Sequence, residues 1–342
     1  MQTRAFITGI AGPELSAAER AFIRRERPWG FILFKRNIET QAQVSNLVKE
    51  LREQVEHPDA PVLIDQEGGR VQRLRPPHWP VYPPGALFGA LYDIDRVLGL
   101  SAARLSARLI AADLGDLGIS VDCLPLADVP VPGADAVIGD RAYGTEPAKV
   151  AAIARAVTEG LQQGGIIPVL KHIPGHGRAT ADTHLKLPQV GTPRAELERT
   201  DFAPFRALAD LPMAMTAHVV FSALDPLHPA TTSATIIQQV IRGVIGFQGL
   251  LMSDDVSMNA LSGSIAERTC AIFGAGCDVV LHCNGRLDEM AAVACNTPEL
   301  SGEALERGKR ALASRRASQP FDRIEARVEL DALTKRAGMA GA

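Results

Sequence analysis

The chain has 342 residues, of which 46% are apolar, 22% are charged and 5% are aromatic, as in an ordinary globular protein. Its 36 Lys and Arg against 39 Asp and Glu give a net charge of −3, without the basic excess typical of proteins that bind nucleic acid or anionic membranes. The few aromatic residues argue against a stacking platform for sugars or single-stranded bases, so we expect a small-molecule partner, no nucleic acid and no membrane.

Eight short apolar runs bounded by turn residues predict buried parallel strands. They cover residues 5–10, 30–34, 61–64, 119–124, 166–170, 213–216, 249–252 and 277–281. Apolar residues at three- and four-residue spacing predict helices between them, over residues 41–54, 95–115, 147–163, 196–209, 233–245 and 265–273. From Ser301 onward the sequence becomes charged and Ala-rich, which predicts a covering helix followed by a solvated tail.

The alternation of eight strands with helices predicts an α/β fold, and eight is the number of strands that closes a single (β/α)8 TIM barrel. A doubly wound sheet is the alternative. Its usual nucleotide-binding signature is a glycine-rich turn after the first strand, and the sequence GIAGP at 9–13 fits neither GxGxxG nor a P-loop. We expect residues 1–300 to form the catalytic barrel and residues 301–342 a C-terminal helix and tail that packs on it or trails from it.

The cysteines and the N-terminal sequence bear on location. The five cysteines are an odd number with no close pair and lie in apolar surroundings, which indicates reduced side chains. The first apolar stretch is too short for a signal peptide, and no apolar run approaches the roughly 20 residues needed to cross a bilayer. We therefore expect a cytoplasmic protein.

Polar side chains follow six of the eight predicted strands, at the end of a barrel where chemistry takes place. A single carboxylate there can simply cap the next turn or begin a helix. However, five of the eight histidines also lie at or just beyond these ends, where scattered core histidines would not cluster. The polar groups are Lys35, Arg36 and Asn37; Asp65, Gln66, Glu67 and Arg70; Lys171, His172 and His176; His218; Ser253, Asp254 and Asp255; and His282, Cys283 and Asn284.

A metal site is one interpretation of the histidines. His172 and His176 are four residues apart, and Asp182 and His184 follow nearby. Histidines at this spacing chelate a metal from a helix, and the Pro-Gly pair between these two breaks a helix. We therefore expect neither a metal nor another cofactor.

Two other interpretations compete with hydrolysis. Lys171 at a strand end could be a Schiff-base nucleophile, as in an aldolase-type lyase. Its neighbours, His172 and several carboxylates, favour a protonated amine that donates hydrogen bonds instead. A non-catalytic sugar-sensing barrel is the third possibility, and it predicts binding without turnover.

Glycoside hydrolysis needs an anionic nucleophile below the sugar ring and a proton donor at the leaving oxygen. Asp254, held at the end of a rigid strand, suits the nucleophile, although Asp255 could be confused with it. Asp182 could orient and polarise His184 as the acid/base, in a loop that we expect to be a mobile lid. Sugar hydroxyls are commonly held by fork-like donors and carboxylates, which Asp65, Arg73 and Arg141 could supply.

The combination and order of these motifs resemble family 3 β-N-acetylglucosaminidases (β-hexosaminidases) of the single-domain, cytoplasmic, Gram-negative type. The resemblance covers residues 8–284 and is far more specific than any one motif. It rests on IDQEGGRVQR at 64–73, GDRAYG at 139–144, KHIPGHG at 171–177, DTH at 182–184 and SDD at 253–255.

This resemblance implies a retaining, exo-acting hydrolase that removes terminal N-acetylglucosamine from 1,6-anhydro-muropeptides in cell-wall recycling. Its small-molecule substrate would be a muropeptide or GlcNAc-anhydroMurNAc, and the chain is expected to act as a monomer. It implies that Asp254 is the nucleophile and His184 the general acid/base, assisted by Asp182. The residues implied to bind the terminal sugar are Asp65, Arg73, Arg141, Lys171 and His172. Ile173 and Arg178 depart from the residues common in the family, which bears on how the lid packs.

Overall fold

The protein is described by a computed structural model, which covers residues 3–179 and 187–340, with side chains to Arg336. Eight parallel strands form a closed barrel in the order β1–β12–β11–β9–β7–β6–β3–β2. Each predicted apolar run contributes one of them, so the (β/α)8 TIM barrel is confirmed and the doubly wound sheet is wrong. The strands are β1 (Arg4–Thr8), β2 (Pro28–Leu33), β3 (Val62–Ile64), β6 (Val121–Asp122), β7 (Ile167–Ile173), β9 (Met213–Thr216), β11 (Leu250–Asp255) and β12 (Val279–His282).

The barrel has two separate apolar layers because successive strand residues point to opposite faces. Ile7 lies in the interior cluster with Leu63 and Val169. Its neighbour Phe6 lies in the outer cluster, between the strands and the helices. Both sides of each strand are therefore buried, which explains why the strands are continuous apolar runs in the sequence.

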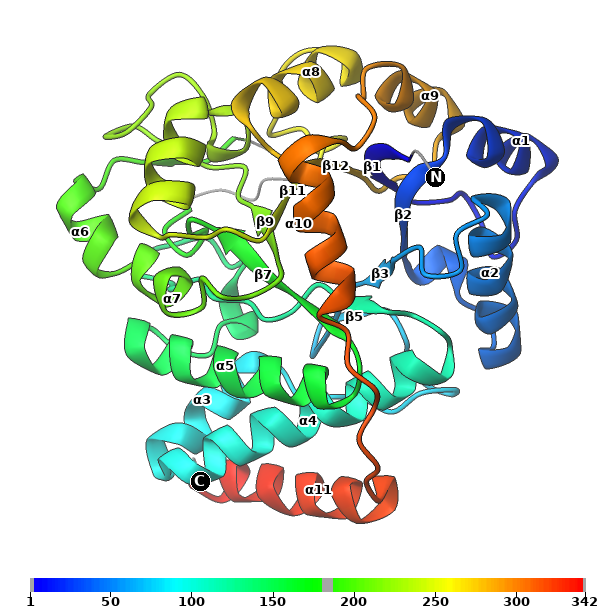
Figure 1. The fold of residues 1–342 in the computed structure, drawn as a ribbon. Coiled ribbons are helices and arrows are strands. Elements are labelled where there is room, and N and C mark those ends of the chain that lie inside the picture. The colour runs from blue at the N-terminus through cyan, green and yellow to red at the C-terminus, as the bar shows by residue number, and fades with distance from the viewer. Residues whose placement is uncertain (1–2, 180–186, 341–342) are drawn as a thin grey trace.

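Helices surround the barrel (Figure 1). The predictions for 41–54 and 147–163 match helices to the residue, and no helix among the described residues is both long and apolar enough to span a bilayer. The helices are α1 (Ala17–Glu26), α2 (Gln41–Gln54), α3 (Gly85–Ile94), α4 (Arg96–Asp116), α5 (Pro147–Gln163), α6 (Arg194–Arg199), α7 (Phe202–Ala207), η4 (Ile236–Val244, a π-helix), α8 (Ile265–Ala275) and α9 (Leu287–Cys295). Shorter elements are η1 (Lys35–Asn37), η2 (Gly139–Arg141), η3 (Ala230–Thr232), β4 (Gln66–Gly68), β5 (Val71–Gln72), β8 (Gln189–Val190) and β10 (Val220–Phe221).

The single helix predicted over 196–209 is wrong, because the segment is broken into α6 and α7. At the break, the buried carboxylate of Asp201 accepts hydrogen bonds from Arg178 Nε and from the hydroxyl of Thr200, both at 2.7 Å. Arg178 also pairs with Glu196 at 3.0 Å. The departure at Arg178 is thus accommodated by two carboxylates from this segment, one of them at the break.

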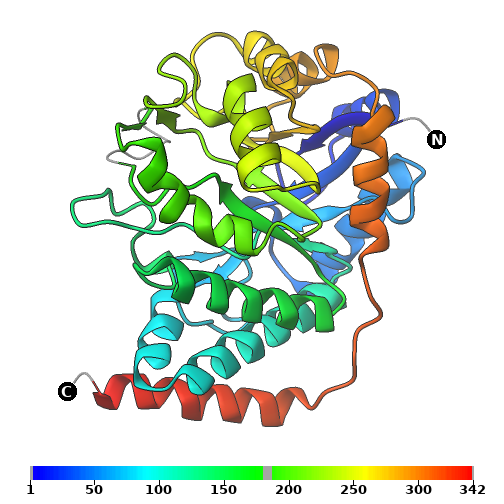
Figure 2. The same cartoon turned by 60° about the vertical axis from the view of Figure 1, so that its left-hand side comes forward.

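The last 40 residues close one end of the barrel and then cover its side. Leu300 lies just before α10 (Gly302–Ala313) and Ala311 lies within it, and both belong to the interior cluster. Arg307 on α10 donates to Asp278 at 2.8 Å, just before β12. Helix α10 therefore lies at the N-terminal ends of the strands, and the opposite end is left for the site. The expected solvated tail is instead helix α11 (Arg323–Ala340), which packs along α3 and α4 (Figures 1 and 2).

We expect Leu330→Ala to lower the free energy of unfolding by about 2–4 kcal/mol, as for other buried leucines. Leu330 on α11 has no exposed surface, and it belongs to the outer apolar cluster. Val328→Ala in the same helix is the matched control, because Val328 is 65% exposed, and should change stability by about 0.5 kcal/mol or less. Urea denaturation of both variants tests this. Equal effects would show that α11 does not pack on the barrel in solution.

Candidate active site

A tight hairpin at the end of β3 brings Arg73 back to Asp65. Gly68 and Gly69 join β4 to β5 with φ values of +97° and +55°, which favour glycine. The side-chain oxygen of Gln66 accepts the backbone N–H of Arg73 at 2.9 Å and holds the returning strand. Arg73 Nη2 then donates to Asp65 Oδ2 at 3.0 Å. The glycine pair of the motif at 64–73 is therefore required by the turn that assembles this ion pair.

Lys171 at the end of β7 lies between two carboxylates. Its side chain is 2% exposed, and Nζ lies 2.8 Å from Asp65 Oδ1 and 2.7 Å from Glu67 Oε1. Arg141, at the end of η2, donates to both oxygens of Glu67, at 2.9 and 2.7 Å. Together with Arg73 these residues form one ion cluster of three cations and two carboxylates. We call it the sugar-site cluster: Asp65, Glu67, Arg73, Arg141 and Lys171.

The charges of the sugar-site cluster support one another. Burial alone would raise the pKa of Asp65, but Lys171 and Arg73 hold it well below its usual range. Burial would also raise the pKa of Glu67, but Arg141 and Lys171 lower this pKa to about 2. Burial would lower the pKa of Lys171, yet the two carboxylates raise it above its ordinary value. Lys171 therefore keeps its proton at neutral pH, which removes the support for a Schiff-base lyase.

Hydrogen bonding distinguishes Asp254 from its neighbour Asp255 at the end of β11. Asp255 holds local structure: its Oδ1 accepts the backbone N–H groups of Ser257 and Cys283, at 3.0 and 3.1 Å, and its Oδ2 accepts the hydroxyl of Ser257 at 2.7 Å. Asp254 accepts the backbone N–H of Asp255 at 2.7 Å through Oδ1. No hydrogen bond to Oδ2 of Asp254 is seen among the described residues, and Asp254 lines the cavity described below. Asp254 is thus the carboxylate available to a ligand.

Electrostatics keep Asp254 ionised. Its burial favours the neutral acid, but interactions with the His218 and His172 rings and the backbone N–H of Asp255 lower the pKa of Asp254 below its ordinary value. Lys171 contributes in the same direction. An ionised carboxylate is the form that a glycosidase nucleophile requires.

His172 near the end of β7 and His176 just after this strand lie side by side, with ring centroids 5.5 Å apart. The buried Asp128 accepts from His172 Nδ1 at 2.7 Å and from the backbone N–H of His176 at 2.7 Å. Burial and the neighbouring His172 lower the pKa of His176 to about 4, so its ring is neutral at neutral pH. Ile173, the other departure from the family pattern, lies between the two histidines in the sequence. It is fully buried.

One cavity of about 310 Å³ at the C-terminal ends of the strands collects the predicted residues. Asp65, Arg73, Arg141, Lys171, His172 and Asp254 all line it. Buried Arg73 Nε has no hydrogen-bond partner among the described residues. The other lining residues are Ile32, Phe34, Arg70, Val71, Val137, Ile138, His176, Met215, Asp255, Met258, Leu281 and Cys283.

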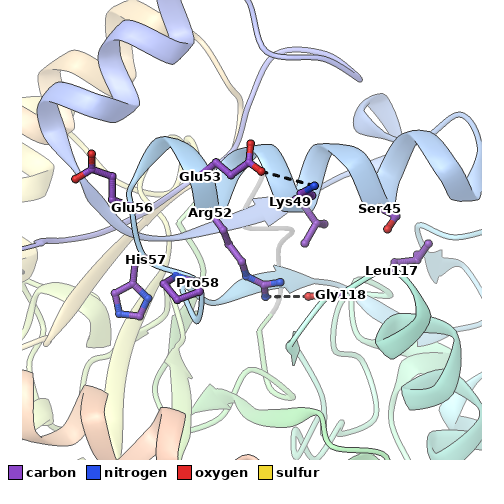
Figure 3. A pocket seen from close by; sticks show the side chains of 10 residues that line it. Ser45, Lys49, Arg52, Glu53, Glu56, His57, Pro58, Leu117 and Gly118 are labelled. Carbon is purple, nitrogen blue, oxygen red and sulfur yellow. Dashed lines mark hydrogen bonds and ion pairs between the residues drawn. The ribbon is translucent and has the colours of Figure 1, made fainter.

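A larger cavity of about 460 Å³ lies elsewhere, between α2 and the segment that follows α4 (Figure 3). Two of its polar side chains have partners in the fold: Arg52 Nη2 donates to the carbonyl of Gly118 at 2.8 Å, and Lys49 lies 3.9 Å from Glu53. Pro58 and Gly118 precede β3 and β6, which places this cavity toward the N-terminal ends of the strands. None of the predicted site residues lines it, so volume alone does not locate the chemistry here.

The structure does not describe every predicted site residue. It also brings Glu67 and Asp128 to the site, which the sequence did not assign to it. Asp182 and His184 lie outside the described residues. Glu67 was visible in the sequence only as a carboxylate that could cap a turn. The sequence signal for Asp128 was its position as a single acidic residue inside the apolar run at 124–129. Because each acts through contacts with distant segments, neither role could be read from local sequence.

Comparisons with known proteins identify the family of this chain. The profile of the glycosyl hydrolase family 3 N-terminal domain matches residues 7–311. A β-hexosaminidase of Alkalilimnicola ehrlichii is 39% identical over 81% of this chain and 79% of its own length, and one of Xanthomonas campestris is 38% identical over 85% and 88%. The structure of NagZ from Neisseria gonorrhoeae in complex with N-trifluoroacetyl-D-glucosamine has a TM-score of 0.88 and 31% identity, covering 98% of this chain and 99% of that chain.

The closed parallel barrel together with the family 3 match defines a glycoside hydrolase of the TIM-barrel class. More particularly, the chain belongs to glycoside hydrolase family 3. Within that family it matches the single-barrel relatives, which are β-hexosaminidases, over most of their length.

Proposed function

We propose that the protein is a retaining exo-β-N-acetylglucosaminidase that hydrolyses terminal N-acetylglucosamine from 1,6-anhydro-muropeptides in cell-wall recycling. It would act as a cytoplasmic monomer, without metal or cofactor. The observation that carries the proposal is the single cavity in which Asp254 shares walls with Asp65, Arg73, Arg141 and Lys171. Support for the sugar comes from the relatives, which are β-hexosaminidases, and from the glucosamine derivative bound to the Neisseria protein.

The charges of the site suit the binding of one terminal sugar. The guanidinium groups of Arg73 and Arg141 and the ammonium of Lys171 supply donors, and Asp65 supplies an acceptor. Asp65 and Glu67 form ion pairs with these cations and hold them in place. The donors are therefore preorganised, and binding requires little rearrangement of their charges.

In the proposed first step, the Asp254 carboxylate attacks the anomeric carbon as the bond to the leaving oxygen breaks, which forms a glycosyl ester. His184, assisted by Asp182, gives the leaving oxygen its proton. In the second step, water attacks the same carbon, His184 takes a proton from that water, and Asp254 leaves as a carboxylate. Two inversions at one carbon retain the β configuration.

Trapping of the glycosyl ester tests the proposal. A 5-fluoro N-acetylglucosaminyl fluoride should react with the enzyme and add one sugar to the peptide that contains Asp254, as measured by mass spectrometry. Asp254→Asn should give no adduct under the same conditions. Hydrolysis of the substrate without any adduct, or an adduct on a different residue, would contradict Asp254 as the nucleophile.

His184→Ala should slow natural substrates more than aryl N-acetylglucosaminides, because an activated aryl leaving group needs little protonation. We expect a loss of about 10²–10⁴-fold in kcat/KM for a disaccharide substrate and a smaller loss for a nitrophenyl glycoside. Parallel assays of both substrates measure the difference. Equal losses would indicate that His184 has a structural role, and Asp182→Asn should follow the same pattern to a lesser degree.

A further inference from the structure

Asp128 is a buried acidic residue to which nothing above assigns a role in the reaction. It lies in the segment after β6, its residue exposure is 0%, and it is absent from the walls of the cavity. It therefore cannot touch a sugar. A buried carboxylate is costly unless it is fully hydrogen-bonded, so its partners indicate what it does.

Among the described residues, all three hydrogen bonds that Asp128 accepts come from the segment that carries the two histidines. Oδ2 lies 2.7 Å from His172 Nδ1, and Oδ1 accepts the backbone N–H groups of His176 at 2.7 Å and His172 at 3.3 Å. Burial would favour the neutral acid, but the adjacent His172 ring and its hydrogen bond hold the pKa of Asp128 below its usual value. Because a carboxylate only accepts hydrogen bonds, Nδ1 of His172 must carry the hydrogen.

The two histidines are not equivalent in this arrangement. Asp128 binds the ring of His172 but only the backbone of His176. Nδ1 of His176 is buried without a hydrogen-bond partner among the described residues. The negative charge of Asp128 is thus directed to the His172 ring, and Nε2 is the nitrogen of that ring left for a ligand in the cavity.

We propose that Asp128 is a positioning residue of the sugar site, which fixes the Nδ1–H form of His172 and holds the 172–176 segment so that His172 Nε2 meets a hydroxyl of the sugar. The effect on activity rests on the proposed function. The predicted hydrogen on Nδ1 of His172 does not rest on the proposed function. Either prediction can therefore fail without the other. Loss of the carboxylate that orients a metal-bound histidine commonly lowers activity by about 10–100-fold, and we expect an effect of similar size for the sugar-binding His172.

Asp128→Asn tests the proposal with little change in volume. An amide that turns its NH₂ toward His172 donates instead of accepting, and so selects the opposite tautomer. We expect kcat/KM for a chromogenic N-acetylglucosaminide to fall by about 10–100-fold. In ¹⁵N NMR spectra at neutral pH, the hydrogen of His172 should move from Nδ1 to Nε2. The His172 signals are assigned by their loss in His172→Asn.

Asp278→Asn is the matched control. Asp278 is also a buried carboxylate with several partners, since it binds Arg242 and Arg307 at 2.8 Å each. It lies before β12, at the end of the barrel away from the cavity. We expect this variant to be less stable, with kcat/KM within about threefold of the parent and an unchanged His172 spectrum.

Each outcome decides the proposal. A folded Asp128→Asn enzyme with kcat/KM within threefold of the parent, or with His172 still protonated at Nδ1, would overturn it. So would losses of activity and stability that match those of Asp278→Asn. If Asp128→Asn does not fold, the spectrum of the parent enzyme decides, because a His172 ring without hydrogen on Nδ1 contradicts the proposal. Absence of activity in the parent enzyme would instead refute the proposed function.

Discussion

Asp254→Asn is expected to lower kcat for an aryl N-acetylglucosaminide by about 10⁴-fold or more, because no other group can form the glycosyl intermediate. Binding of the sugar should change much less, since the sugar-site cluster remains complete. The amide is nearly isosteric and can still accept the backbone N–H of Asp255, a contact of 2.7 Å in the parent. Steady-state kinetics and the affinity for N-acetylglucosamine measure the two effects. Turnover close to that of the parent would contradict the assignment of the nucleophile.

Asp255→Asn is the control for Asp254→Asn, because the two carboxylates are neighbours with different contacts. Asp255 is engaged by Ser257 and Cys283. We therefore expect its replacement to lower stability by about 1–3 kcal/mol through weaker hydrogen bonds, and to lower kcat by tenfold or less. If Asp255→Asn abolished turnover and Asp254→Asn did not, the roles of the two residues would be reversed.

Lys171→Met is expected to lower the free energy of unfolding by about 3–5 kcal/mol at neutral pH, because it leaves buried charges uncompensated. Lys171 bonds to both Asp65 and Glu67, and each would keep only its arginine partner. Lys309→Met is the control, since Lys309 and its partner Glu306 are 60% and 57% exposed and such pairs contribute about 1 kcal/mol or less. Urea denaturation measures both. Similar losses in the two variants would contradict the burial of the sugar-site cluster.

The cost of Lys171→Met should depend on pH in the acid range. Asp65 and Glu67 have pKa values in the folded protein that lie below their unfolded values of about 4, with Glu67 at about 2. A lowered carboxyl pKa stabilises the folded state above the unfolded pKa, and that stability is lost as the pH falls toward the folded pKa. The difference between parent and variant should therefore be full above about pH 5 and shrink between about pH 4 and 2. A difference independent of pH would exclude this coupling.

The candidate site was predictable in part because a barrel carries its chemistry at one end of its strands. Asp65, Lys171, His172 and Asp254 each stand at the end of an apolar run, and the structure brings them to one cavity together with Arg73 and Arg141. The sequence left Asp254 and Asp255 interchangeable. Only the hydrogen bonds of Asp255 to Ser257 and Cys283 distinguish them, and the partners of Glu67 and Asp128 lie 74 and 44 residues away.

The sequence by itself determined the eight strands and helices such as α2 and α5, because apolar periodicity is a local property that burial on one or both faces imposes. Tertiary structure decided the rest. At the break between α6 and α7, Asp201 accepts a hydrogen bond from Arg178, which lies more than 20 residues away in the sequence. Helix α11 has a weakly patterned sequence, and its helical state is stabilised where Leu330 is buried against the outer cluster. Helices in proteins gain most of their stability from tertiary packing rather than from propensity. Tertiary contacts therefore determined where these elements begin and end.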